Sequence, residues 1–262
     1  MQILTCRPEH YAVVYSINPW MNPQTNNADT QLANEQWQTL TDLIRSTGNE
    51  VVEIDPAPGW PDMVFTANAG LIKDKKVVLS NFTHPERNGE EPYFKRWFED
   101  NGYEVLEVEE TFEGAGDSLF FGDVLFAGHG FRTEKCVYEK IKEFLDIEII
   151  VLSHLIDPYF YHLDTCFCPL NDELALILPA AFDPWMVEEV GIFTDIKLRS
   201  VPSDEAKNFA CNAVVLADTV IIPSDCPETR RILEMEGFHV LDCPMTEFLK
   251  AGGACKCLTL KL

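Results

Sequence analysis

Two short runs of this sequence combine residue types that can perform nucleophilic and acid–base chemistry. Near the C-terminus, Cys257 follows a lysine and the pair Gly252-Gly253, which permits a tight approach of the backbone. A cysteine beside positive charge can ionise and act as a nucleophile. In the second run, His162 and Asp164 share one face if the stretch is a strand, and such a histidine can serve as general acid or base. Taken singly, such a cysteine is more often a buried structural thiol, and such a histidine more often lies on the surface.

Two further runs place polar side chains beside turns. The run Glu113-Gly-Ala-Gly-Asp117 has two carboxylates around a flexible loop, which can orient a histidine or bind a guanidinium through paired hydrogen bonds. In residues 61–70, Phe65 lies between an aspartate and Asn68, ahead of an expected strand. An ordinary acidic turn and a polar loop are the alternatives.

Arg87 and Arg132 stand out because basic residues are scarce in this chain. The 262 residues include 20 Lys and Arg against 43 Asp and Glu, a formal net charge of −23. Either arginine could bind a substrate carboxylate or form a surface salt bridge. The negative balance argues against a nucleic-acid or anionic-membrane partner and is compatible with a small cationic substrate. No apolar run is long enough to span a bilayer.

The nine cysteines bear on compartment and on metal binding. The N-terminal residues lack the apolar core of a secretory signal, so we expect a cytoplasmic protein with reduced thiols. Cys166-Phe-Cys168 and Cys255-Lys-Cys257 each leave a single residue between the cysteines, whereas structural zinc pairs usually leave about two to four. We therefore expect no metal site. The common glycine-rich phosphate loops are also missing from the sequence.

Turn signals divide most of the chain into four copies of one order: hairpin, helix, strand. The period of roughly 45 residues is typical of repeat architectures. The hairpins begin at Ala69, Ser118, Thr165 and Ala213; the helices are expected at 90–100, 134–145, 184–190 and 228–236; the closing strands are expected at 103–108, 148–152, 196–201 and 239–242. Glycine ends three of the helices, as in Gly102-Tyr-Glu-Val105, which suits a left-handed cap.

The two ends of the chain together make a fifth copy. The N-terminus supplies a strand (Gln2–Arg7), a helix (Gln31–Ser46) and a second strand (Glu50–Ile54), but it lacks one hairpin arm. Leu258–Leu262 can supply that arm. The resulting ring would leave few exposed sheet edges, and an open α/β sandwich is the alternative.

Taken together, these runs resemble the guanidino-group modifying enzyme superfamily, which contains arginine deiminases, dimethylarginine dimethylaminohydrolases and amidinotransferases. The resemblance covers nearly the whole chain and rests on the joint order of five motifs: Ile17-Asn-Pro-Trp-Met21, Phe65-Thr-Ala-Asn68, Glu113-Gly-Ala-Gly-Asp117, His162-Leu-Asp-Thr165 and Gly252-Gly253 before Cys257. It implies an α/β fold, the five-bladed α/β propeller (pentein), with residues 1–262 as one catalytic domain closed by its terminal strands.

The same resemblance assigns roles to individual residues. It implies Cys257 as nucleophile, with Cys255 as second choice, His162 as general acid/base and Glu113 as the carboxylate that assists it. It implies substrate contacts at Asn18, Phe65, Asn68, Arg87, Arg132, Asp164 and the backbone of Ala251. Asp164 would grip the guanidinium, and the two arginines would hold the α-carboxylate. No cofactor or metal is required, and a homo-oligomer is possible.

Asn68 determines the narrower prediction. Deiminases of this superfamily usually have aspartate there, and an amide leaves a site able to hold a neutral ureido group. The sequence resembles the arginine dihydrolase branch, whose members convert L-arginine to ornithine, carbon dioxide and ammonia. The alternatives are a dimethylarginine hydrolase or deiminase that releases citrulline, an amidinotransferase, and a non-catalytic arginine sensor. Residues 22–29 are a candidate lid.

Overall fold

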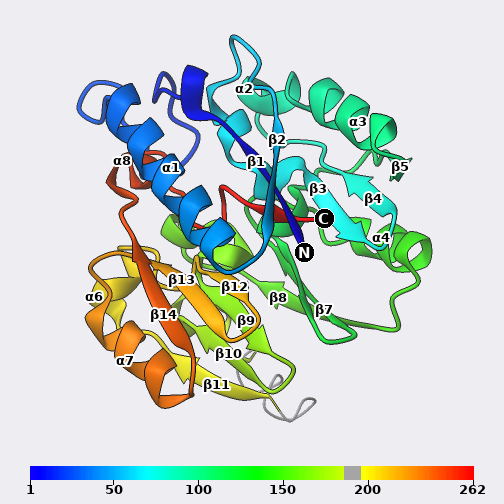
Figure 1. Cartoon of the computed structure of the whole chain (residues 1–262). Helices are drawn as coiled ribbons and strands as arrows, with labels where there is room; N and C mark the ends of the chain where they lie inside the picture. The colour runs from blue at the N-terminus through cyan, green and yellow to red at the C-terminus, as the bar shows by residue number, and fades with distance from the viewer. Residues whose placement is uncertain (186–195) are drawn as a thin grey trace.

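Five three-stranded sheets surround a central axis in the computed structural model, which describes residues 1–185 and 196–262 (Figure 1). Four sheets follow one another along the chain: β3 (Gly70–Lys73), β4 (Lys76–Leu79) and β5 (Glu104–Leu106); β6 (Ser118–Phe121), β7 (Val124–His129) and β8 (Ile149–His154); β9 (Phe167–Asn171), β10 (Leu174–Ile177) and β11 (Lys197–Ser200); β12 (Val214–Leu216), β13 (Thr219–Pro223) and β14 (His239–Cys243). Helices cover the outside of this ring (Figure 1).

The strand pairing explains the repeated order read from the sequence. Within each of these sheets the first two strands form an antiparallel hairpin, as in the pair Ser118↔Ala127. The third strand runs parallel to the second, as in Val124↔Ile149. Parallel neighbours need a long crossover, and a helix supplies it. Three crossover helices are α3 (Glu91–Asp100), α4 (Val137–Leu145) and α7 (Pro227–Met235).

The termini build the remaining sheet, in the order β15 (Leu260–Lys261), β1 (Gln2–Cys6), β2 (Glu50–Ile54). Leu260 pairs with Leu4 in an antiparallel ladder, and β1 pairs in parallel with β2. The C-terminal strand therefore completes the first blade and brings the two ends of the chain together (Figure 1). This confirms the predicted five-bladed α/β propeller.

Helix α1 (Thr30–Ser46) shows how the helices attach to the ring. Asp29 caps it by accepting a hydrogen bond from the Leu32 N–H at 3.0 Å, and the stripe Trp37, Leu40, Ile44 is buried against the first blade. The predicted glycine caps are also present: Gly102, after α3, has a φ of 76°. Three short α-helices, together with the 3-10 turns that precede several inner strands, complete the described set: α2 (Pro85–Asn88), α6 (Ser203–Ala206) and α8 (Thr246–Leu249).

Some local expectations need correction. His162 and Asp164 would share a face if their stretch were a strand, but Leu163–Thr165 forms a 3-10 turn, so they do not. The hairpin strand expected from Thr165 begins at Phe167. Cys257 lies in a turn before β15 rather than at the start of that strand. The helix expected at 184–190 falls mostly outside the described residues. Across the ranges 1–185 and 196–262, no helix is both long and apolar enough to cross a membrane.

Candidate active site

Cys257 lies at one end of the central axis, in the turn that precedes the innermost strand β15. Its Sγ is 3.1 Å from Asn212 Nδ2 and 3.5 Å from the nearer oxygen of Asp164, and its N–H donates to Asn212 Oδ1 at 3.1 Å. The residue is 3% exposed. Burial and the Asp164 carboxylate raise the pKa of the Cys257 thiol, while Lys256 and Asn212 oppose that shift. Asn212 and Asp164 thus hold the thiol in place. It stays protonated unless a further positive charge comes close to it.

His162 and Glu113 form a second buried group beside this thiol. The His162 Nε2 is 2.7 Å from Glu113 Oε2, and Arg132 Nη1 donates to the same carboxylate at 2.9 Å. Burial alone would raise the pKa of Glu113, but Arg132 and His162 outweigh it, and the net shift is downward. Glu113 is therefore an anion that can orient His162 and stabilise its protonated form.

Asn68 connects the histidine group to a second buried arginine. Its Nδ2 donates to the Glu113 carbonyl at 3.1 Å, and its Oδ1 accepts from Arg87 Nη1 at 3.0 Å. Arg87 also binds Glu90 through two hydrogen bonds of 2.8 and 2.9 Å. Because both faces of the amide are engaged, its orientation is fixed by its neighbours.

The opposite wall is made of segments far apart in the sequence. Asn18 Nδ2 donates to the Ala251 carbonyl at 3.0 Å and to the Tyr161 hydroxyl at 3.1 Å. The two glycines predicted to allow close approach do so here. A Cβ at Gly252, where φ is 80°, would lie 2.9 Å from the Tyr161 hydroxyl, and a Cβ at Gly253 would lie 2.6 Å from the Phe65 ring.

These walls enclose a small pocket of about 20 Å³. Eight of the predicted residues line it: Asn18, Phe65, Asn68, Arg87, Arg132, His162, Ala251 and Cys257. Glu113 and Asp164 lie behind His162 and Cys257, in contact with them. The structure therefore brings all ten predicted residues together. A pocket of this volume holds one or two waters, so a larger ligand must first displace side chains. Ile17 and Met21, which precede the candidate lid, are part of the pocket wall.

Three neighbours of the pocket were not predicted. Asp62 lines it, is 1% exposed, and its Oδ1 has no hydrogen-bond partner in the described part of the chain. Burial raises the pKa of Asp62 against the effect of Arg87. Tyr161 precedes His162, and its ring lies 4.5 Å from the Arg132 guanidinium. Asp62 and Tyr161 stand within or beside noted motifs, whereas nothing in the sequence marks Asn212.

The arrangement of His, Cys, Asp and Glu side chains determines whether a metal ion could be held. Among the described residues there is no group of three or more His, Cys, Asp or Glu side chains that could hold a metal ion. The nine cysteines include eight buried residues and one exposed residue, Cys136. The polar groups at the pocket are instead suited to nucleophilic attack and proton transfer.

Comparison with known proteins places this geometry in a family. The bifunctional arginine dihydrolase/ornithine cyclodeaminase ArgZ of Synechocystis is 47% identical over 268 residues, covering 100% of this chain but 38% of ArgZ. The N-terminal domain of ArgZ has been solved bound to product and, as an asparagine-to-serine mutant, covalently bound to a reaction intermediate. Each structure has 48% identity, a TM-score of 0.94 and coverage of 99% of this chain and 96% of that domain.

A second relative carries a different activity in its name. The N(G),N(G)-dimethylarginine dimethylaminohydrolase of Mycobacterium tuberculosis is 36% identical over 256 residues, covering 97% of this chain and 83% of its own length. The sequence profile described as N,N dimethylarginine dimethylhydrolase, eukaryotic, matches residues 12–262. The chain belongs to the dimethylarginine dimethylaminohydrolase family, within the guanidino-group modifying enzymes.

Proposed function

We propose that this chain is an arginine dihydrolase, a single catalytic domain of residues 1–262 that converts L-arginine and two waters to ornithine, carbon dioxide and two ammonia. The observation that carries the proposal is the amide of Asn68, fixed between Arg87 and the Glu113 backbone in a pocket that also holds Cys257 and His162. The chain spans 38% of ArgZ, which is described as an arginine dihydrolase, and the part of ArgZ that it matches is the N-terminal domain, solved bound to product.

Substrate binding follows from the charges around the pocket. Asp164, which lies 3.5 Å from the nucleophilic sulfur, holds the guanidinium by charge-assisted hydrogen bonds and so presents its central carbon to Cys257. Arg87 and Arg132 hold the α-carboxylate. Asn18, Phe65 and the Ala251 carbonyl provide the remaining contacts along the opposite wall.

The first half of the reaction replaces one guanidinium nitrogen by sulfur. The substrate cation next to Cys257 offsets the effect of burial and Asp164, so the bound state favours the thiolate. Sulfur bonds to the central carbon, and His162 gives a proton to a terminal nitrogen. The carbon–nitrogen bond breaks, ammonia leaves, and a covalent thiouronium remains. Glu113 stabilises the charged form of His162.

Hydrolysis of this intermediate restores the enzyme. His162 removes a proton from water, the oxygen bonds to the central carbon, and the carbon–sulfur bond breaks to give a citrulline-like ureido group. A neutral ureido group is retained by an amide at position 68 and one carboxylate, Asp164, where two carboxylates would favour only a cation. A second attack by Cys257 and a second water then release ammonia and a carbamate, which breaks down to carbon dioxide and ornithine.

Product identification tests this proposal. Arginine labelled with ¹³C at the guanidinium carbon is incubated with the enzyme, and products are followed by mass spectrometry and NMR. We expect labelled carbon dioxide and unlabelled ornithine. We also expect Asn68→Asp to shift the product toward labelled citrulline. Citrulline as the only product of the unaltered enzyme would refute the dihydrolase assignment, and an unchanged product ratio in Asn68→Asp would remove the role given to the amide.

Release of citrulline from dimethylarginine is the second candidate. The observation in its favour is the family itself, together with the 36% identical relative from Mycobacterium tuberculosis. The same assay with asymmetric dimethylarginine separates the two: dimethylamine and citrulline formed faster than any product of arginine would favour this alternative. Turnover in water without an amine acceptor would exclude an amidinotransferase, and any turnover would exclude a sensor.

A further inference from the structure

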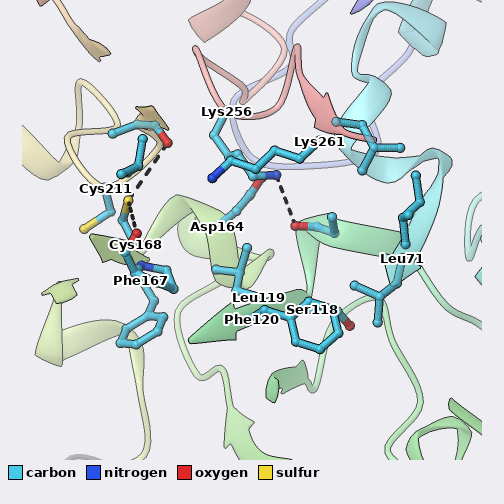
Figure 2. A pocket seen from close by; sticks show the side chains of 16 residues that line it. Leu71, Ser118, Leu119, Phe120, Asp164, Phe167, Cys168, Cys211, Lys256 and Lys261 are labelled. Atoms are coloured by element: carbon cyan, nitrogen blue, oxygen red, sulfur yellow. Dashed lines mark hydrogen bonds between the residues drawn. The ribbon is translucent and has the colours of Figure 1, made fainter. Parts of the chain in front are cut away.

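A second cavity lies on the central axis, and Asp164, which contacts Cys257, is part of its wall. It has a volume of about 170 Å³, several times that of the active-site pocket. The innermost strand of every blade contributes to its wall: β3, β6, β9, β12 and β15. Apolar residues of these strands line it, among them Leu71, Leu119 and Phe167 (Figure 2). Val215 and Leu260 line it as well.

Two lysines and one carboxylate are the charged groups of this axial cavity. Lys256, Lys261 and Asp164 gather on one side of it (Figure 2). The Lys256 ammonium donates to the Ala115 carbonyl at 3.5 Å, and neither lysine forms an ion pair within the described residues. Two ammonium groups and one carboxylate leave one net positive charge facing apolar walls, in a chain whose net charge is −23.

Lys261 lies in an environment that disfavours its charge. Lys261 is exposed as a whole residue, yet desolvation of its ammonium by the surrounding protein, and then the charge of Lys256, lower its pKa. A bound anion would relieve both effects. The cavity has room for several waters or for one small organic ion, and its walls suit an alkyl chain.

We propose that this axial cavity is a second ligand site, which binds a small aliphatic monocarboxylate through Lys256 and Lys261 and thereby lowers turnover at Cys257. The carboxylate group pairs with the two ammonium groups, and the alkyl chain packs against Leu119, Phe167 and Leu260. A single negative charge neutralises the single excess positive charge. This inference goes beyond the dihydrolase activity, and the binding itself does not depend on it.

Lys256 couples the axial cavity to the active site because it stands beside Cys257 in the chain. Its positive charge opposes the upward pKa shifts of both Cys257 and Asp164. An anion that neutralises Lys256 removes this help, so a smaller fraction of Cys257 is thiolate. The expected inhibition is therefore noncompetitive with arginine, since the two pockets share no lining residue.

Direct binding tests the proposal without using turnover. Saturation-transfer NMR follows sodium butyrate, with butyramide as neutral isostere, at constant ionic strength set by chloride. We expect millimolar binding of butyrate and none of butyramide. Lys261→Met should weaken butyrate binding at least about tenfold, whereas Lys142→Met, which removes the same charge from the exposed face of α4, should leave it unchanged. Far-UV circular dichroism verifies that each variant is folded.

Four results would overturn the proposal, three with butyrate and one with phosphate. The first is a lack of butyrate binding at tens of millimolar to the unaltered protein. The second is binding that Lys261→Met does not weaken. The third is displacement of butyrate by saturating arginine in Cys257→Ser, which would place the anion in the active site instead. Inorganic phosphate is run in parallel, and tighter Lys261-dependent binding of phosphate than of butyrate would refute the carboxylate assignment.

Discussion

The two ends of the central axis handle charge in opposite ways. At the active-site end, Arg87 is bonded to Glu90 and Arg132 to Glu113, all fully buried. In the axial cavity, Lys256 and Lys261 face apolar walls, with no ion-pair partner in the described residues. Breaking a buried pair is costly, and an unpaired charge in a cavity is relieved by a ligand. The active-site end is therefore pre-organised by ion pairs within the protein. The two lysines of the axial cavity remain available to bind a ligand.

Loss of the nucleophile is the largest effect we expect. Cys257→Ser should lower the turnover of arginine by at least about 10⁴-fold, because a hydroxyl at neutral pH is a far weaker nucleophile than a thiolate. The matched control is Cys255→Ala, two residues earlier, which removes a buried thiol outside the pocket lining and should retain turnover. Steady-state kinetics measures both. Substantial activity in Cys257→Ser, or its loss only in Cys255→Ala, would reassign the nucleophile.

Removal of the Glu113 charge disrupts the ion pairs at the active-site end. Glu113→Gln leaves Arg132 buried without its partner, so we expect the free energy of unfolding to fall by about 3–5 kcal/mol. His162 also loses the anion that stabilises its protonated form, and kcat should fall by roughly 10²–10³-fold. The control Glu110→Gln breaks an exposed pair with Lys140 and should change little. Equal effects of both substitutions would contradict the contrast between buried and exposed pairs.

The buried ion pair of Glu113 and Arg132 also predicts how the stability of the protein depends on pH. The pKa of Glu113 is lower in the folded chain than its ordinary value, so its stabilisation is present above that value and is lost as pH falls through the folded pKa. The stability difference between the unaltered protein and Glu113→Gln should therefore not shrink as pH falls from about 6 to 5, and it should shrink only below about pH 4. Urea denaturation at several pH values measures it, and a difference that already shrinks between about pH 6 and 5 would be inconsistent with a low pKa.

Much of this architecture follows from local sequence signals, and the exceptions have physical causes. The hairpins, crossover helices and glycine caps are set by alternation, periodicity and turn residues near in sequence, and Gly102 shows the cap that was expected. The turn at Leu163–Thr165 was missed because apolar and polar residues alternate there as in a strand, while the backbone is set by contacts such as the Leu163 N–H to Asp117 at 3.1 Å.

The sequence located the site because its motifs occur together in a recognisable order. Among the site residues that it missed, Asn212 belongs to no such motif. Asn212 lies 45 residues from Cys257 in sequence, in a stretch of small apolar residues, and only the folded ring brings its amide to the sulfur. The axial cavity is similar, since its wall takes side chains from five sheets and its charge comes from two lysines near the C-terminus. No local pattern encodes a concavity between distant strands.

Asn212 should have a smaller effect than Glu113 because it contributes hydrogen bonds rather than a buried charge. Asn212→Ala removes the 3.1 Å contact to Sγ, which helps to lower the pKa of Cys257. A hydrogen bond to a charged group contributes about 1.5–3 kcal/mol, so we expect the thiol pKa to rise by about 1–2 units. The pH profile of iodoacetamide labelling at Cys257, read by peptide mass spectrometry, measures this. Asn208→Ala, which loses only an exposed contact to Asp225, is the control. A profile that does not move would reduce Asn212 to a structural role.

The smallest effect that we expect is a change in thermal stability. It tests whether the lysines of the axial cavity lack ion-pair partners. If the charge of Lys261 is disfavoured by burial and by Lys256, replacing it with an apolar side chain of similar length should stabilise the protein rather than weaken it. We expect Lys261→Met to raise the Tm at pH 7 by about 1–2 °C. Because the folded pKa of Lys261 lies below its ordinary value, the gain should shrink as rising pH removes the proton, and it should vanish above the ordinary pKa of lysine, about 10.4. Differential scanning calorimetry from pH 7 to 10.5 follows the change. A lower Tm for Lys261→Met at pH 7 would mean that Lys261 is already paired and that the two ends of the axis treat charge alike.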